Sequence, residues 1–83
     1  SWLNRHWGQY TEKRDAVVAL LDSMDLWAGQ LHAAGRPDYE IQRTFYLKFG
    51  VDPYTAQTLD ARETKELKER IDGAVNSFYA LSG

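Results

Sequence analysis

The sequence contains no cysteine and only two histidines. The lack of cysteine excludes a disulfide framework, a thiolate metal site and a thiol nucleophile, and we expect a cytoplasmic protein. His6 and His32 have no neighbour at metal-ligand spacing, so no metal site is expected. The glycines are scattered, so no phosphate-binding loop and no cofactor are expected either. Asp22 and Asp25 are interpreted as surface groups, and we therefore predict no catalytic residues and no enzyme activity of the domain alone.

Net positive charge is also lacking. Ten Lys and Arg residues oppose twelve Asp and Glu residues, which gives a net charge of −2. A chain so close to neutrality has no general positive field to draw it onto nucleic acids or anionic membranes, so any such binding needs a local patch. No apolar run approaches the roughly 20 residues of a membrane span. We expect no membrane partner.

Aromatic residues, in contrast, are plentiful: three Trp, five Tyr and three Phe in 83 residues. A chain of this length buries only about 60 to 65% of its unfolded surface, and bulky rings supply burial that a small domain lacks in residue count. We predict a single helical domain over residues 1–83. Because the chain starts at Ser1 and stops just after an apolar stripe, we interpret it as a domain excised from a longer protein.

Hydrophobic periodicity predicts two long helices. The first covers about residues 11–34 with Thr11 as its N-cap, and the last covers about residues 60–81 with Asp60 and Glu63 as a capping box. Each carries an apolar stripe that indicates a core-facing side. The stripes are Val17, Leu20, Leu21, Met24, Trp27, Ala28 and Leu31, and then Leu67, Ile71, Ala74, Val75, Phe78 and Leu81.

The outer side of the last helix places opposite charges four residues apart, which predicts surface ion pairs. These pairs are Arg62 with Glu66, Lys65 with Glu69, and Glu66 with Arg70. Gly73 interrupts the same helix, and it marks either a close helix contact or a soft point.

A short helix is predicted from residue 37 or 38 to residue 49, and a second from Pro53 to about Leu59. Gly50 ends the first, while Asp52 and Pro53 are suited to begin the next. Apolar side chains occupy more than one face of the first short helix, which is typical of a helix packed on both sides. These side chains are Ile41, Phe45 and Phe49 on one face and Tyr39, Tyr46 and Leu47 elsewhere. The predicted fold is therefore all-α: a small helical bundle in which two long antiparallel helices flank two short helices joined by a tight turn.

The corner FGVDPYT resembles the helix-turn-helix superfamily over about residues 37–59. The matching positions are Phe49, Gly50, Val51, Asp52 and Thr55, preceded by Ile41. The resemblance implies that the second helix lies in the major groove and that the preceding helix contacts phosphates. It assigns Tyr54, Thr55, Gln57 and Thr58 to bases, and Arg36, Arg43 and Lys48 to phosphates. The implied function is that of an accessory domain of a larger nucleic-acid-processing or regulatory protein, which contacts DNA or RNA without catalysis.

A second interpretation stays open. Residues 36–59 contain three basic and three acidic side chains, so the segment is neutral, whereas phosphate neutralisation supplies most non-specific affinity for nucleic acid. The N-terminal SWLNRHWGQY, whose spacing permits helical turns before Thr11, offers Trp2, Trp7 and Tyr10 as partner-binding residues, because Trp and Tyr are enriched at interface hot spots. The same rings could instead cap the core, or stack on single-stranded bases. The alternative function is a helical protein-interaction or oligomerisation module that uses these aromatics, with a separate protein or the remainder of the parent chain as its partner.

Overall fold

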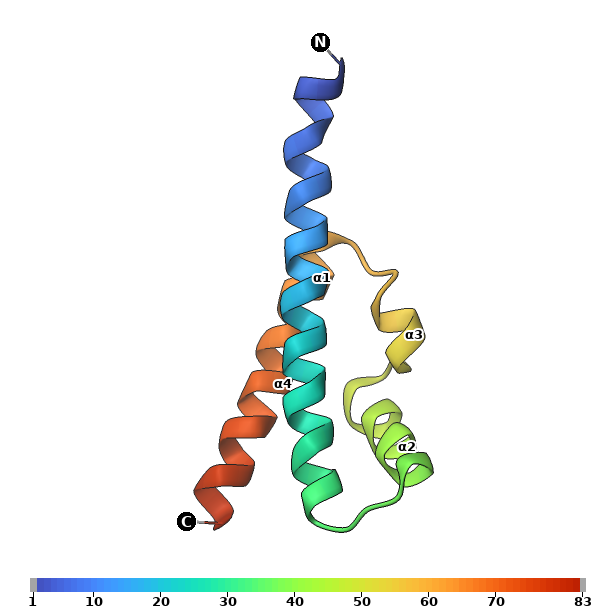
Figure 1. Ribbon diagram of the computed structural model, residues 1–83, viewed down its shortest axis with the longest axis vertical. Coiled ribbons are helices and arrows are strands. Elements are labelled where there is room, and N and C mark those ends of the chain that lie inside the picture. Colours follow the sequence, from blue (N-terminus) through green and yellow to red (C-terminus); the bar gives the residue numbers. More distant parts are fainter. Residues whose placement is uncertain (1, 83) are drawn as a thin grey trace.

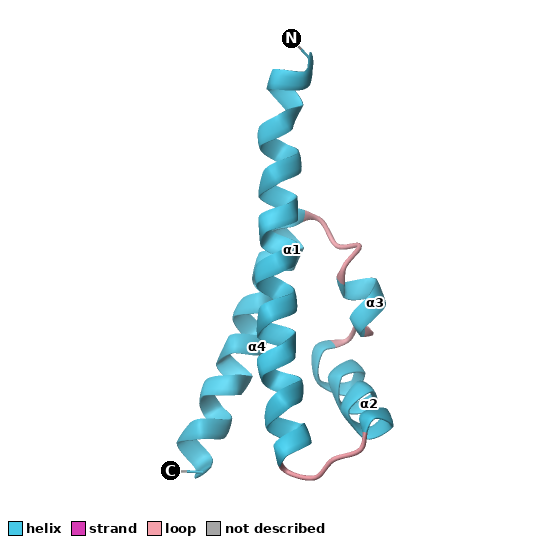
Figure 2. Cartoon of the chain, in the orientation of Figure 1, coloured by secondary structure: helices cyan, strands magenta, loops and turns pink. Residues whose placement is uncertain are grey.

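The structure, a computed structural model, describes residues 2–82, with side chains described for residues 11–78. Four helices make up this part of the chain: α1 (Trp2–Ala33), α2 (Asp38–Phe49), α3 (Pro53–Ala56) and α4 (Ala61–Ser82). Figures 1 and 2 show them as a small bundle without strands in the described residues, drawn out at one end by α1. The predicted all-α fold and helical bundle are confirmed.

The two long helices pack side by side and run in the same direction (Figure 1). Near the start of α4, the Lys65 ammonium lies 2.6 Å from the Glu12 carboxylate. Further along both helices, the Gln30 amide donates to the carbonyl of Val75 at 3.2 Å. The antiparallel arrangement is therefore wrong. Segment 34–60, with α2 and α3, carries the chain back towards the N-terminal half of α1 before α4 begins. The two long helices are therefore separated in sequence by two short helices, and they can pack in the same direction.

The packed seam between α1 and α4 alternates steps of four and three residues along α1, as in a coiled coil. Its buried members are Ala16, Leu20, Ser23, Trp27 and Gln30 on α1, and Thr64, Leu67, Ile71 and Val75 on α4. The centres of the predicted stripes are confirmed, but polar residues share the seam. Each of them has a hydrogen-bond partner. Ser23 donates to the Asp72 carboxylate at 2.6 Å, Gln30 donates to the Val75 carbonyl, and Thr64 donates to the Leu59 carbonyl at 3.4 Å. Phe78, which was predicted in the stripe of α4, is exposed, so the buried part of that stripe ends at Val75, and the Leu81 side chain lies outside the described residues.

α1 begins well before the predicted N-cap. The helix continues through Thr11 back to Trp2, so the proposed boundary is wrong, and the helical spacing upstream of it was the better guide. A helix of 32 residues extends about 48 Å at 1.5 Å per residue. This length accounts for the elongated outline of 52 × 26 × 17 Å.

One side of α2 packs against both long helices. Ile41, Phe45 and Phe49 are buried there. The ring of Trp27 from α1 meets the rings of Phe45 and Phe49 edge to face, with both centroid distances 5.5 Å. Such geometry is favourable for aromatic pairs. These rings join α2 to the seam of the long helices.

The opposite side of α2 is not covered. Tyr39 is 76% exposed, Tyr46 56% and Leu47 70%. The prediction that α2 is packed on both sides is therefore wrong, and α2 lies on the surface of the α1–α4 pair. Apolar periodicity alone cannot distinguish a second buried face from one left in solvent.

The corner after α2 follows the predicted turn chemistry. Gly50 has φ of +81°, in the left-handed region that favours glycine. Asp52 caps α3 by accepting the Thr55 backbone N–H at 2.8 Å, which lowers the pKa of the Asp52 carboxyl. However, α3 ends at Ala56 and does not reach Leu59. Only one helical turn follows the corner.

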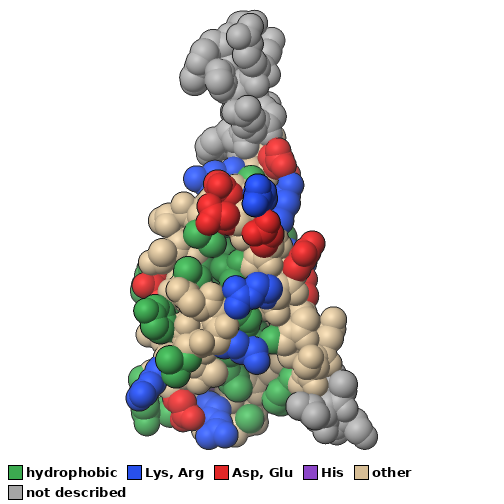
Figure 3. Space-filling model, turned by 180° about the vertical axis from the view of Figure 1, so that it is seen from behind, with side chains coloured by type: hydrophobic (Ala, Val, Ile, Leu, Met, Phe, Trp, Pro, Cys, Tyr) green, Lys and Arg blue, Asp and Glu red, His purple; other side chains and the backbone are tan. Residues whose placement is uncertain are grey.

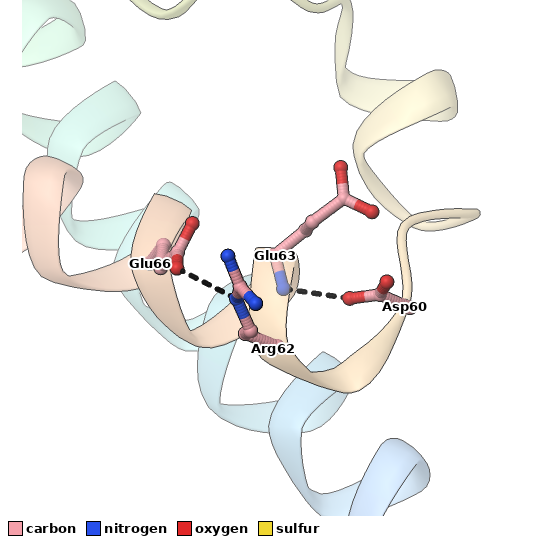
Figure 4. Close-up of polar contacts among 4 residues, drawn as sticks. All are labelled: Asp60, Arg62, Glu63 and Glu66. Atoms are coloured by element: carbon pink, nitrogen blue, oxygen red, sulfur yellow. Dashed lines mark hydrogen bonds and ion pairs between the residues drawn. The ribbon is translucent and has the colours of Figure 1, made fainter.

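The Asp60 half of the capping box predicted at the start of α4 is confirmed (Figure 4). The Asp60 carboxylate accepts the Glu63 backbone N–H at 2.8 Å, and this bond lowers the pKa of Asp60. Within the described residues, the Asp60 backbone N–H makes no hydrogen bond to the Glu63 carboxylate, so the Glu63 half of the box is not formed; the neighbouring Asp60 carboxyl raises the pKa of Glu63. On the outer side, Arg62 Nε lies 3.2 Å from Glu66 Oε1, as the four-residue spacing predicts.

Candidate functional site

The side chains that the helix-turn-helix resemblance assigned to bases are mostly engaged within the corner itself. The Thr55 hydroxyl donates to the Asp52 carboxylate at 3.1 Å. The Gln57 amide and the Thr58 hydroxyl donate to backbone carbonyls of α3 at 3.2 and 2.8 Å. Tyr54, at 80% exposure, projects into solvent. The hydrogen bonds of Thr55, Gln57 and Thr58 thus stabilise α3, a one-turn helix of four residues that is only about 6 Å long.

The three basic residues assigned to phosphates are not equivalent. Arg36 pairs with Glu40 at 3.3 Å. Arg43 and Lys48 are exposed on α2 and make no ion pair with the side chains described. Segment 36–59 thus offers two unpaired cations.

Most basic side chains of α4 also have acidic partners. Arg62 pairs with Glu66, Lys65 with Glu12 and Lys68 with Asp72. Lys65 therefore reaches across to α1 rather than pairing with Glu69 as predicted. Figure 3 shows acidic and basic side chains intermixed over this part of the surface. Paired charges present a weaker field to a polyanion than unpaired ones.

Arg70 has a role that sequence reasoning missed. Its guanidinium donates to the backbone carbonyls of Lys48 at 3.1 Å and Phe49 at 3.5 Å, and it lies 5.7 Å from the centre of the Phe49 ring. These contacts satisfy carbonyls that α2 leaves without helical partners at its C-terminal end. The predicted pair with Glu66 is replaced by this contact between α4 and α2. The available signal was the position of Arg70 directly beside the buried Ile71.

Exposed apolar side chains concentrate on the α2–α3 segment. Of the seven large hydrophobic residues exposed in the described part of the chain, four lie there. On α2 they share one side with a single cation: Tyr39, Arg43, Tyr46 and Leu47. We call these four residues the tyrosine face. Their spacing of i, i+4, i+7 and i+8 places them along one side of the helix over about 12 Å. Figure 3 shows hydrophobic side chains along the edge that α2 and α3 form.

The aromatic residues predicted to bind a partner lie at the other end of the molecule. Trp2, Trp7 and Tyr10 belong to the first turns of α1, and their side chains lie outside the described residues. Their role in binding a partner therefore stays a prediction.

Residues that could support other functions do not assemble in the described part of the chain. No three side chains of the metal-binding types come together there. No helix in that part is both long and apolar enough to cross a membrane. Comparison with known proteins adds no relative: no family model matches the chain, and neither the curated proteins nor the solved structures give a significant match.

Proposed function

We propose that the protein is a non-catalytic, helical protein-interaction module that binds its partner through the tyrosine face of α2. The observation that carries this proposal is that Tyr39, Tyr46 and Leu47 are each more than half exposed on a helix whose other side is buried. Removing apolar surface from water stabilises a complex by about 25 cal/mol per Å². A partner that covers this side of α2 would gain the part of that free energy that exceeds the cost of lost translational, rotational and side-chain freedom.

The composition of the tyrosine face supports a protein partner. Tyr and Arg are enriched among the residues that dominate interface energetics. Arg43 lies four residues after Tyr39 and three before Tyr46, so the three side chains are neighbours on one side of the helix. Its guanidinium has no carboxylate partner among the described side chains. The partner surface should therefore present a carboxylate surrounded by apolar groups.

This proposal takes up the interaction alternative of the sequence analysis and moves its contact surface from the N-terminal aromatics to α2. Nucleic-acid binding stays a prediction. The ion pairs of Arg36, Arg62, Lys65 and Lys68 and the local hydrogen bonds of the corner favour the interaction function, because both reduce what the domain can offer to phosphates and bases.

The test starts from partners captured by the immobilised domain and identified by mass spectrometry, each then purified and measured by calorimetry. Tyr46→Ser and Arg43→Ala are each expected to weaken binding at least about tenfold, which is about 1.4 kcal/mol. Glu69→Ala is the matched control, because Glu69 is exposed on the outer side of α4, and it should leave the affinity unchanged.

Two results would refute the proposal. The first is a Tyr39→Ser, Tyr46→Ser double variant that keeps wild-type affinity for every captured partner. The second is binding to duplex or single-stranded DNA at low salt that is lost in Arg43→Ala, Lys48→Ala while no protein partner responds to the tyrosine variants. The second result would establish the nucleic-acid function instead.

A further inference from the structure

We propose that a groove between α1 and α2 is a separate binding site for a peptide segment of a partner, and that it takes one apolar side chain next to a Lys or Arg. The groove has a volume of about 290 Å³. That is close to the lower end of the range for ligand pockets, so it suits a single side chain. The site lies on the side of α2 that faces α1 and does not depend on the tyrosine face.

The floor of the groove is apolar and rigid. Trp27, Ile41 and Phe45 form it, and all three are buried. The edge-to-face contact of Trp27 with Phe45 fixes the two rings relative to each other. Pro53 of α3 also lines the groove. An apolar side chain entering from solvent would meet the partly buried Met24 and Ala28 and the edges of this cluster beneath them.

The rim of the groove is acidic. Asp25 comes from α1 and Asp38 from α2, and no Lys or Arg lines the groove. Asp38 lies 3.2 Å from His32 Nε2 yet remains largely exposed, and Asp25 makes no ion pair with any described side chain. Carboxylates on both walls favour a cation and disfavour an anion at the mouth.

These two properties together define the occupant. The apolar floor requires a hydrophobic side chain, and the acidic rim requires a positive charge within one residue of it. A peptide segment meets both requirements with neighbouring residues, because the long, flexible side chain of a Lys or Arg can bend back to a carboxylate beside the position that its apolar neighbour fills. An acidic or purely polar segment would meet neither requirement.

The test uses short peptides as probes of the folded domain labelled with ¹⁵N. N-acetyl-Leu-Arg-amide is titrated to concentrations of about 20 mM, because contacts of this size support millimolar affinity. N-acetyl-Leu-Glu-amide and N-acetyl-Gly-Arg-amide are the matched probes. The Leu-Arg probe should give saturable shifts of the Ala28, His32 and Gln42 amides, with affinity at least about threefold higher than either matched probe.

Variants then locate the binding. Asp25→Asn is expected to weaken the Leu-Arg probe by about twofold to threefold, whereas Asp22→Asn, which removes an exposed carboxylate of the same helix outside the groove, should have no effect. Ala28→Leu should fill the groove and abolish the shifts while the rest of the spectrum stays dispersed. The proposal is overturned by unsaturable shifts, by equal binding of the Leu-Glu or Gly-Arg probe, or by equal effects of the two Asp variants.

Discussion

Replacing Arg70 with alanine tests whether α4 holds the C-terminal end of α2 in place. The side chain makes two kinds of contact there: hydrogen bonds to the carbonyls of Lys48 and Phe49 at 3.1 and 3.5 Å, and an approach of 5.7 Å to the Phe49 ring. Arg70→Ala removes both and leaves the backbone of α4 unchanged, since alanine is the most favourable residue in a helix.

The expected loss follows from these distances. Hydrogen bonds from charged donors contribute about 1.5 to 3 kcal/mol, but Arg70 is exposed and one of its two bonds is at the distance limit, so we take about 1 kcal/mol for the pair. The cation–π contact adds about 0.5 to 1 kcal/mol at an exposed site. The free energy of unfolding should therefore fall by about 1.5 to 2 kcal/mol. For a domain of this size, that corresponds to a Tm decrease of about 6 to 16 °C.

Urea unfolding followed by circular dichroism measures the effect, and hydrogen exchange of the last amides of α2 locates it. Arg62→Ala is the control, because the ion pair of Arg62 with Glu66 is exposed and lies within one helix, and the substitution should cost less than about 0.5 kcal/mol. If the two variants lose the same stability, or if exchange rises in α4 but not in α2, Arg70 does not hold α2 and the reasoning fails.

Three further outcomes are expected. Gly73→Ala should raise the free energy of unfolding by about 0.5 to 1 kcal/mol in urea melts, because an added Cβ meets nothing within 4 Å; a decrease would reveal a contact of Gly73 that the structure lacks. Gly50→Ala should lower it by about 1 kcal/mol, since φ is +81°, and no loss would mean that the corner relaxes freely. The Lys68 and Ser23 side chains hold the pKa of Asp72 below its ordinary 3.8, so its stabilising contribution is present above that value and is lost as the pH falls through the lowered pKa. In Asp72→Asn the free energy of unfolding should accordingly fall less steeply as the pH is lowered, as measured by urea melts at several pH values. An unchanged acid dependence would show that Asp72 is not its source.

Local chemistry made the helix ends predictable. Gly50, Asp52 and Asp60 act on backbone groups within a few residues of themselves, so their roles can be read from short windows of sequence. The buried stripes were predictable for the same reason, because helical periodicity depends only on spacing. Thr11 was misleading because a good N-cap residue also tolerates a helix interior when stronger signals lie upstream.

Long-range arrangement was not predictable in this way. The direction of α4 relative to α1 depends on the path of residues 34–60, and nothing within α4 records that path. The partner of Arg70 depends on the same path. Glu66, four positions away on the same helix, could be named from spacing alone, whereas the end of α2 comes near Arg70 only when the chain has folded. The burial of Ser23 and Gln30 was likewise not predictable, because each is tolerated in the seam only through a hydrogen bond to α4.

The candidate site shows the same division. Arg43 was selected from sequence for its charge, but Tyr39, Tyr46 and Leu47 were expected to be buried, because an apolar residue on a helix is more often a core residue. Their exposure depends on the absence of a further element over α2 in the described part of the chain. The groove rim likewise combines Asp25 and Asp38 from different helices, which only the tertiary structure brings together.

The parallel orientation of α1 and α4 also constrains how the chain folds. Consecutive helices joined by a short turn can zip together from that turn. Here the polar contacts between the long helices join residues 45 to 53 positions apart, so a loop of that size must close before the first of them forms. Folding should therefore start with α1 and α2, which are joined by residues 34–37 and share the Trp27 contacts, and α4 should dock last. With its contacts so distant in sequence, the domain should fold more slowly than a helical hairpin of equal length.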